Sequence, residues 1–156
     1  MKGDLERAIV DFDAAIKLEA NLAVAYHDRG TTYGLRGDND RDIVDFTTAI
    51  KLDPKYQAAY FHRANTYYEK RDMDRAISDY DSALKLEPDF ATAYNARGLA
   101  YDAKNKVDEA VKDFDQAMKL DPKNARAYNN RCFAVRNRGE LDRAIADSQA
   151  LVLNGS

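Results

Sequence analysis

The sequence repeats itself with a period of 34 residues. The motif Ala-Tyr-X-X-Arg occurs four times, with its tyrosine at Tyr26, Tyr60, Tyr94 and Tyr128. A fixed period of this length is typical of a stack of small similar units, in which each unit buries its apolar face against its neighbours. We therefore expect function to lie on a surface presented by the units and not in a single catalytic pocket.

Residues of one kind recur at the same place when the unit begins at Ala23. The eighth place holds the small residues Gly30, Ala64, Gly98 and Cys132, and the eleventh holds Tyr33, Tyr67, Tyr101 and Val135. In the later half, one column holds Ala8, Asp42, Ala76, Ala110 and Ala144. The next columns hold Phe12, Phe46, Tyr80, Phe114 and Ser148, and then Ala15, Ala49, Ala83, Ala117 and Leu151.

The spacing within one unit predicts two helices joined by a tight turn. Tyr26, Gly30 and Tyr33 lie on one helical face because they are spaced i, i+4 and i+7. Gly37 suits the left-handed conformation that closes a helix, and Asp53-Pro54 ends the second helix. The predicted helices span residues 4–18, 22–36, 38–52, 57–70, 72–86, 91–104, 106–120, 125–138 and 140–153.

The order of aromatic, small, aromatic, then Ala, Phe, Ala and Pro resembles the tetratricopeptide repeat (TPR) over the whole chain. The resemblance implies an all-α fold, a right-handed superhelical solenoid of antiparallel helix hairpins. Residues 1–22 would be the second helix of a truncated preceding repeat. Complete repeats would span 23–56, 57–90 and 91–124, and 125–156 would be an atypical last repeat that could act as a cap, all in one solenoid domain.

Composition argues against several classes of function. The chain has 24 basic and 27 acidic residues and a net charge of −3, which gives no basic field for a nucleic-acid backbone. It has no apolar run long enough to cross a membrane and no signal peptide, and a single cysteine cannot form an internal disulfide. These features favour a soluble, cytoplasmic protein, although a fragment could have lost its targeting sequence.

The seventh place of each unit is arginine, and an aspartate recurs in the second helix. The ion pairs expected from these columns are Arg29 with Asp45, Arg63 with Asp79, Arg97 with Asp113 and Arg131 with Asp147. Asp11 of the preceding unit is an alternative partner for Arg29, and Asp42 could add a second acceptor. A row of arginines could bind an acidic ligand, but a ladder of structural ion pairs is the better interpretation because every unit supplies the partner.

In TPR proteins the first helices line a concave face along which partner peptides lie. Phe61, Tyr68 and Phe133 lie on first helices but outside the repeat columns. Together with polar neighbours they are expected to form a peptide-binding groove, which the resemblance and their aromatic and amide chemistry favour over ordinary solvated surface. The groove residues are His27, Phe61, His62, Asn65, Tyr68, Asn95, Leu99, Arg126, Asn129, Asn130 and Phe133.

Two specialised TPR sites are not matched. The clamp that binds a carboxylate terminus in chaperone-binding members would need Lys at Phe61, Asn at Asn65, Asn at Ala96, Lys at Arg126 and Arg at Asn130. Only Asn65 fits fully, with Arg126 fitting by charge. The asparagine ladder of O-linked N-acetylglucosamine transferase is also absent, because its column reads Asp28, His62, Ala96 and Asn130.

Catalytic, metal and cofactor sites are not expected. His27 and His62 lie one unit apart and could be neighbours, but a zinc or copper site would want a third ligand such as Asp28. Cys132 falls in the small-residue column and is expected to be a buried, inert thiol.

The sequence therefore predicts a non-catalytic scaffold that binds a peptide or partner protein of unknown identity, without nucleic acid or membrane insertion. An alternative is the docking or regulatory arm of a larger enzyme. A third interpretation is self-assembly through uncapped ends, in which the unpaired helix at 4–18 contacts another chain.

Overall fold

The computed structural model describes residues 2–137, and within this range every regular element is an α-helix. The helices are α1 (Lys2–Leu18), α2 (Ala23–Leu35), α3 (Asn39–Leu52), α4 (Gln57–Glu69), α5 (Met73–Leu86), α6 (Ala91–Ala103), α7 (Val107–Leu120) and α8 (Ala125–Asn137). Eight of the predicted helices are thus present, each with ends within two residues of those expected. The predicted helix at 140–153 lies outside the described residues.

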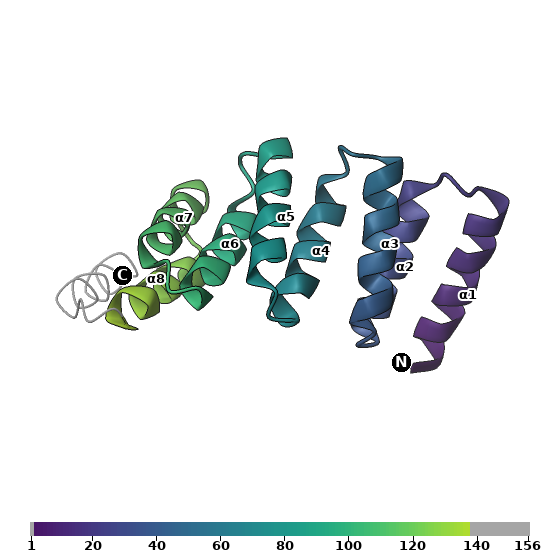
Figure 1. The fold of residues 1–156 in the computed structure, drawn as a ribbon, viewed down its shortest axis with the longest axis horizontal. Coiled ribbons are helices and arrows are strands. Elements are labelled where there is room, and N and C mark those ends of the chain that lie inside the picture. The colour runs from purple at the N-terminus through teal and green to yellow at the C-terminus, as the bar shows by residue number, and fades with distance from the viewer. Residues whose placement is uncertain (1, 138–156) are drawn as a thin grey trace. The chain divides into compact units, whose positions relative to one another are not determined.

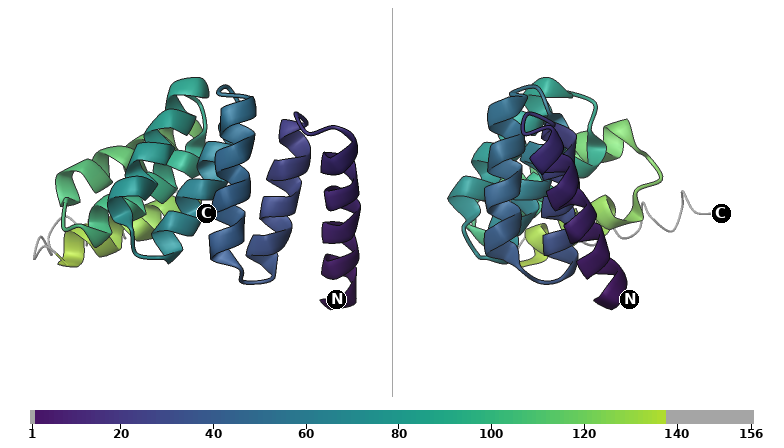
Figure 2. Two further views of the ribbon diagram at one scale, coloured as in Figure 1. Left: turned by 45° about the vertical axis from the view of Figure 1, so that its right-hand side comes forward. Right: turned by 90° about the vertical axis from the view of Figure 1, so that its right-hand side faces the viewer.

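The chain divides into two compact units, Met1–Leu86 and Glu87–Ser156. In the first unit, α2 pairs with α3 and α4 pairs with α5, while α1 packs against α2 (Figure 1). The two hairpins of this unit meet where α4 contacts both α2 and α3 (Figure 2). In the second unit, α6 pairs with α7, and α8 contacts both of them.

The turn inside each complete hairpin is closed by one residue in the left-handed conformation. Gly37, Arg71 and Asn105 have φ of 81°, 62° and 57°. In each case the next N–H group reaches back to a tyrosine carbonyl at 2.9 Å, as Asp38 does to Tyr33. This six-to-one bond is the Schellman ending of a helix, and only glycine adopts the required φ without steric cost.

Small residues on the first helices make room for aromatic rings on the second. A Cβ atom added to Gly98 would lie 2.7 Å from the ring of Phe114, which is fully buried in α7. The same column places Gly30 against Phe46 in the first unit, where a Cβ atom would lie 3.1 Å from the ring. The two helices of a hairpin therefore approach closely, and this close approach fixes which first-helix faces stay outside the core.

Candidate functional site

Arg29 joins three helices of the first unit. It lies on α2 and donates to both carboxylate oxygens of Asp45 on α3, from Nε at 2.8 Å and from a terminal nitrogen at 2.7 Å. Its other terminal nitrogen donates to Asp13 on α1 at 2.5 Å. The hydrogen bond that Arg29 donates to Asp45 is the main cause of a raised pKa of the guanidinium, so Arg29 stays charged.

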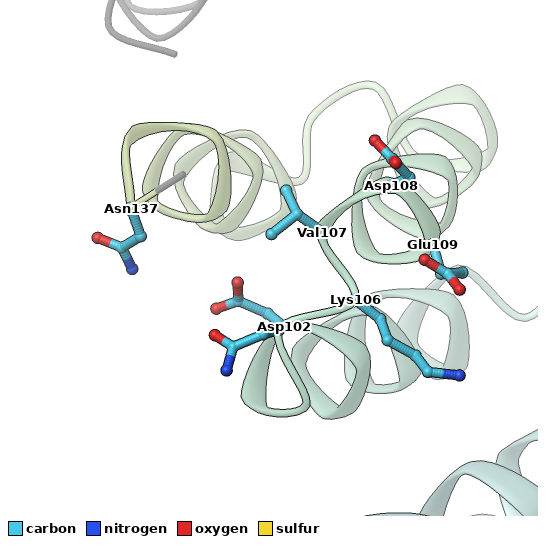
Figure 3. A pocket seen from close by; sticks show the side chains of 7 residues that line it. Asp102, Lys106, Val107, Asp108, Glu109 and Asn137 are labelled. Atoms are coloured by element: carbon cyan, nitrogen blue, oxygen red, sulfur yellow. The ribbon is translucent and has the colours of Figure 1, made fainter. Parts of the chain in front are cut away.

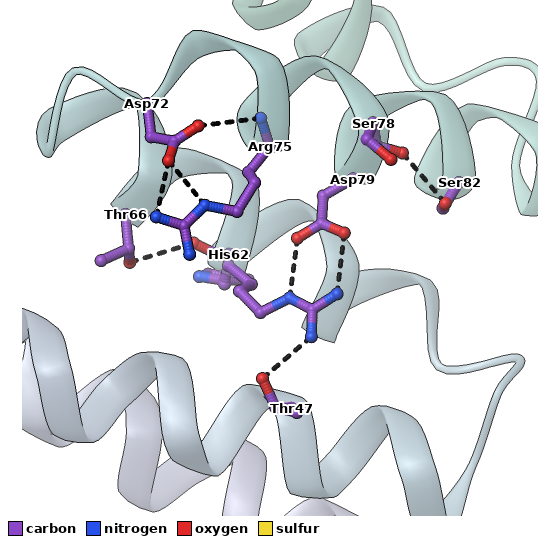
Figure 4. Close-up of polar contacts among 9 residues, drawn as sticks. Thr47, His62, Thr66, Asp72, Arg75, Ser78, Asp79 and Ser82 are labelled. Atoms are coloured by element: carbon purple, nitrogen blue, oxygen red, sulfur yellow. Dashed lines mark hydrogen bonds and ion pairs between the residues drawn. The ribbon is translucent and has the colours of Figure 1, made fainter.

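Arg63 repeats this arrangement one hairpin later. It donates to Asp79 on α5 at 2.7 and 2.8 Å and to the hydroxyl of Thr47 on α3 at 2.9 Å. Figure 4 shows Asp79 and Thr47 on opposite sides of the shared guanidinium. Both partners of Arg63 are 16 residues away in the sequence. Asp79 lies forward, on the second helix of the same hairpin, and Thr47 lies backward, on the second helix of the preceding hairpin.

The second unit contains the same elements. Arg97 on α6 donates to Asp113 on α7 at 2.7 and 2.6 Å, and Arg131 on α8 donates backward to Asp115 on α7 at 2.5 Å. Asp147, the expected forward partner of Arg131, lies outside the described residues. The four arginine side chains are only 15–20% exposed, and their aspartate contacts link neighbouring helices.

Two details of the expected contacts are wrong. The partner of Arg29 on the preceding helix is Asp13 and not Asp11. Asp42 does not contact Arg29. It accepts a hydrogen bond from the hydroxyl of Thr66 on α4 at 3.0 Å.

Asp42 is a buried carboxyl group in a column that is otherwise alanine. It is 2% exposed, and its second oxygen has no hydrogen-bond partner within the described part of the chain. Burial raises the pKa of Asp42 to about 7, with the Thr66 hydrogen bond acting in the opposite direction. Glu69 and Asp38 add to the increase, whereas Lys70 opposes it.

The predicted groove residues of the first unit lie on α2 and α4, and part of them form a ring cluster. The rings of His27 and His62 are 5.1 Å apart and nearly perpendicular, and both also contact Phe46 of the core. The ring of Tyr56 lies 4.9 Å from that of His27, tilted by 40°. Burial and the neighbouring His27 lower the pKa of His62, so this histidine is neutral at pH 7.

The remaining three groove residues of this unit are Phe61, Asn65 and Tyr68, all half-buried on α4. Phe61 contacts the rings of His62 and Tyr80. The Tyr80 hydroxyl donates to the side-chain oxygen of Asn65 at 2.6 Å. This bond fixes the orientation of the amide and leaves the N–H donors of Asn65 for another acceptor.

The second unit presents an amide pair on α6 and α8. The Asn130 side chain donates to the Asn95 side-chain oxygen at 2.9 Å. Phe133, one turn along α8, is 43% exposed, and the guanidinium of Arg136 lies 4.4 Å from its ring centre. Arg126 and Asn129 are exposed, whereas Leu99 packs against the cluster of Ala110, Phe114 and Ala134 and contributes to the core.

A polar hollow at the turn between α6 and α7 was not expected from the sequence. Its walls are Asp102, Asn105, Lys106, Val107, Asp108, Glu109 and Asn137. Figure 3 shows Asp102 directed into the hollow and Lys106 extending away from it. Burial raises the pKa of Asp102. Asn105, a residue type that tolerates the left-handed conformation, indicates the turn beside this hollow in the sequence, and its φ is 57°.

Residues 2–137 contain no group of three or more His, Cys, Asp or Glu side chains that could hold a metal ion. None of the described helices is both long enough and apolar enough to span a bilayer. Cys132 is half-buried on α8, so it is less enclosed than the small-residue column suggested.

Comparisons with known proteins agree with the architecture. The sequence model of the tetratricopeptide repeat matches residues 27–89, 61–125 and 95–153. A crystal structure of MamA is similar with a TM-score of 0.89 and 25% identity, over 95% of this chain and 81% of that one. A search of curated proteins gives no match.

Two further similar structures are a TPR domain with a bound peptide and a TPR protein with a peptide-binding site. The first TPR domain of Spaghetti (RPAP3), bound to the HSP90 peptide SRMEEVD, has a TM-score of 0.73 and 28% identity over 75% of this chain and 93% of that one. YrrB, described as a TPR protein with an unusual peptide-binding site, has a TM-score of 0.82 over 93% of this chain and 75% of that one, but its 20% identity shows the fold alone. The predicted all-α repeat solenoid is therefore confirmed.

Proposed function

Because the chain belongs to the tetratricopeptide repeat family, we propose that it is a non-catalytic scaffold whose first-helix faces bind peptide segments of partner proteins. The binding surface of the first unit is formed by α2 and α4, and that of the second unit by α6 and α8. This follows the relatives, since the RPAP3 domain is bound to a peptide of HSP90 and YrrB has a peptide-binding site.

The observation that carries the proposal is the amide pair beside an exposed ring. The bond between Asn130 and Asn95 leaves both N–H donors of Asn95 and the side-chain oxygen of Asn130 available. One donor and one acceptor side by side match the C=O and N–H groups of an extended peptide backbone. Phe133 supplies an apolar contact next to them, with more than two-fifths of its surface accessible.

The first unit supports the same type of recognition. Asn65 offers N–H donors between Phe61 and Tyr68, so an amide again lies beside aromatic rings. Apart from Arg29 and Arg63, which are paired with aspartates, the charged residues on α2 and α4 are Asp28 and Glu69, both acidic. This surface therefore favours a neutral or basic peptide.

The peptide is of a different class from the acidic one bound to RPAP3. SRMEEVD carries three carboxylate side chains and a C-terminal carboxylate, which require lysine or arginine partners. Two positions of the carboxylate clamp that would be basic are Phe61 and Asn130 here. We propose that these substitutions replace recognition of charge by recognition of the peptide backbone and of apolar side chains.

Selection of peptides from a random library tests the proposal. Peptides of about twelve residues, long enough to follow two helices of one unit, are selected on the immobilised chain and measured by fluorescence anisotropy. N130A and F133A should each weaken binding to the second unit by about tenfold or more. SRMEEVD, measured in parallel, should bind much more weakly than the selected sequences.

The matched control is V44A, which truncates an exposed apolar side chain on α3, a second helix. It should leave the affinity unchanged. The corresponding variants of the first unit are F61A and Y68A. The proposal would be refuted if the selected peptides bound all four variants as tightly as the unmodified chain. Circular dichroism of each variant checks that the fold is retained.

A further inference from the structure

Thr47 on α3 stands in a repeat column that is mostly acidic. Read at intervals of 34 residues, the column holds Asp13, Thr47, Asp81, Asp115 and Gln149. An aspartate of this column accepts a hydrogen bond from Arg29 in one repeat and from Arg131 in another, both at 2.5 Å. Thr47 takes the same place beside Arg63, with its hydroxyl oxygen accepting at 2.9 Å. A neutral oxygen therefore occupies a position that elsewhere presents a carboxylate to an arginine.

Arg63 has one carboxylate partner where Arg29 has two. Arg29 lies between Asp45 and Asp13 and donates to both. Arg63 pairs with Asp79 on α5, and its contact to the preceding hairpin is the hydroxyl. Hydrogen bonds from a guanidinium to an anion are roughly twice as strong as hydrogen bonds between neutral groups. A negative group on that hydroxyl would therefore give Arg63 the second anionic contact that Arg29 already has.

The surroundings of Thr47 offer room and a second positive charge. The aspartate side chains at the equivalent positions Asp13 and Asp115 are 53% and 48% exposed, so this side of the guanidinium is open to solvent. Lys51 is an exposed residue four positions further along α3, where side chains are neighbours on a helix surface. Asp79 lies on the opposite side of the guanidinium from Thr47 (Figure 4). A negative group on Thr47 would thus lie near two cations and apart from that carboxylate.

We propose that Thr47 is a phosphorylation site whose phosphate group takes the place of the aspartates and binds Arg63. A protein kinase supplies the phosphoryl group from a nucleoside triphosphate. The bond between Oγ1 of Thr47 and the γ-phosphorus forms, and the bond from this phosphorus to the bridging oxygen of the β-phosphate breaks. The hydroxyl proton passes to a base of the kinase, and the nucleoside diphosphate leaves.

The modification would strengthen the contact between two hairpins. The phosphate carries nearly two negative charges at neutral pH and three acceptor oxygens, whereas the hydroxyl is a single neutral acceptor. Thr47 belongs to α3 and Arg63 to α4, so the new ion pair joins the hairpin of α2 and α3 to that of α4 and α5. The site lies on a second helix and does not depend on the proposed peptide binding.

Thr48 provides the matched control, because it is the next residue of the same helix but has a different environment. Its hydroxyl donates to the backbone carbonyl of Val44 at 2.9 Å. Phosphothreonine is incorporated at position 47 or at position 48 of the whole chain, and phosphorus NMR follows each phosphate through a pH titration. The second pKa of the phosphate at 47 should be about one unit lower than at 48, a tenfold difference in acid dissociation constant, because Arg63 binds the dianion.

Urea unfolding of the same two proteins measures the effect on the contact between the hairpins. The unfolding equilibrium constant should be about tenfold smaller with phosphate at 47 than with phosphate at 48. Equal phosphate pKa values and equal unfolding constants would overturn the proposal, because the phosphate at 47 would then have no cationic partner.

A kinase assay tests whether the hydroxyl is a substrate. The unmodified chain is incubated with MgATP and a panel of purified serine/threonine kinases that differ in their preference for acidic, basic or proline-containing sites. Mass spectrometry of the tryptic peptide that spans residues 42–51 then locates the phosphate. We expect incorporation at Thr47 that T47V, which keeps the shape of the side chain without its hydroxyl, removes. Absence of phosphate at residue 47 with every kinase would overturn the proposal.

Discussion

Replacing Asp42 by asparagine should remove most of a pH dependence of stability from the first unit. Asp42 is almost completely buried, and only one of its oxygens has a hydrogen-bond partner within the described residues. In the unfolded chain its pKa is near the ordinary 3.8, whereas in the folded chain burial raises it to about 7. The folded state therefore binds more protons than the unfolded state between these two values.

The sign and size of the effect follow from this difference. The stability that Asp42 contributes is fully present below about pH 4 and is lost as the pH rises through about 7. A difference of about three pH units corresponds to about 4 kcal/mol, which is an upper bound because the structure can relax around the charge. D42N has a neutral side chain of the same shape, so it avoids this loss while the amide stays close to Thr66.

Urea unfolding followed by circular dichroism at several pH values between 4 and 8 measures the effect. The free energy of unfolding of D42N minus that of the unmodified chain should increase by about 2–4 kcal/mol across this range. Taking the difference cancels the pH dependence that the two proteins share. D42A, which restores the alanine of the other repeats, should show the same trend. A difference that is independent of pH would refute the reasoning.

Three further predictions concern the stability of the repeats, and urea unfolding tests each of them. T47D should stabilise the first unit by about 1 kcal/mol, because a carboxylate would replace a hydroxyl as the acceptor for Arg63; an unchanged or lower midpoint would contradict this. G98A should destabilise by about 2 kcal/mol or more, and G30A by less, because the added Cβ is 2.7 Å from a buried ring in one case and 3.1 Å in the other; equal losses would count against the packing argument. R71G should stabilise by about 1 kcal/mol, because a non-glycine residue there adopts a φ of 62°; a loss of stability would show that the arginine side chain has a compensating contact.

The helices and the pairing of Arg29 with Asp45 could be derived from the sequence because both depend on spacing within one hairpin. Residues 16 apart across a turn are brought level by helix geometry alone. The backward contact to Asp13 could not be derived, since it depends on how one hairpin rotates against the preceding one. A shift of two residues on α1 separates the expected Asp11 from the observed Asp13.

Asp42 and Leu99 show the same limit for side chains. The repeat columns marked Asp42 as an exception, but its partner Thr66 belongs to the next hairpin. The sequence predicts Leu99 among the groove residues, yet it packs against the core of its own unit. A repeat column shows what the corresponding positions of all repeats share. Sequence periodicity therefore does not predict a contact that occurs in one repeat only.

We propose that peptides bind to the first-helix faces and not to the second helices. The most direct test is to titrate the isotope-labelled chain with a library-selected peptide and follow backbone amide shifts by NMR. We expect the largest shifts to cluster on α2 and α4 or on α6 and α8, with side-chain amide shifts at Asn65 or at Asn95 and Asn130. Shifts concentrated on the outer surfaces of α3, α5 and α7 would contradict it.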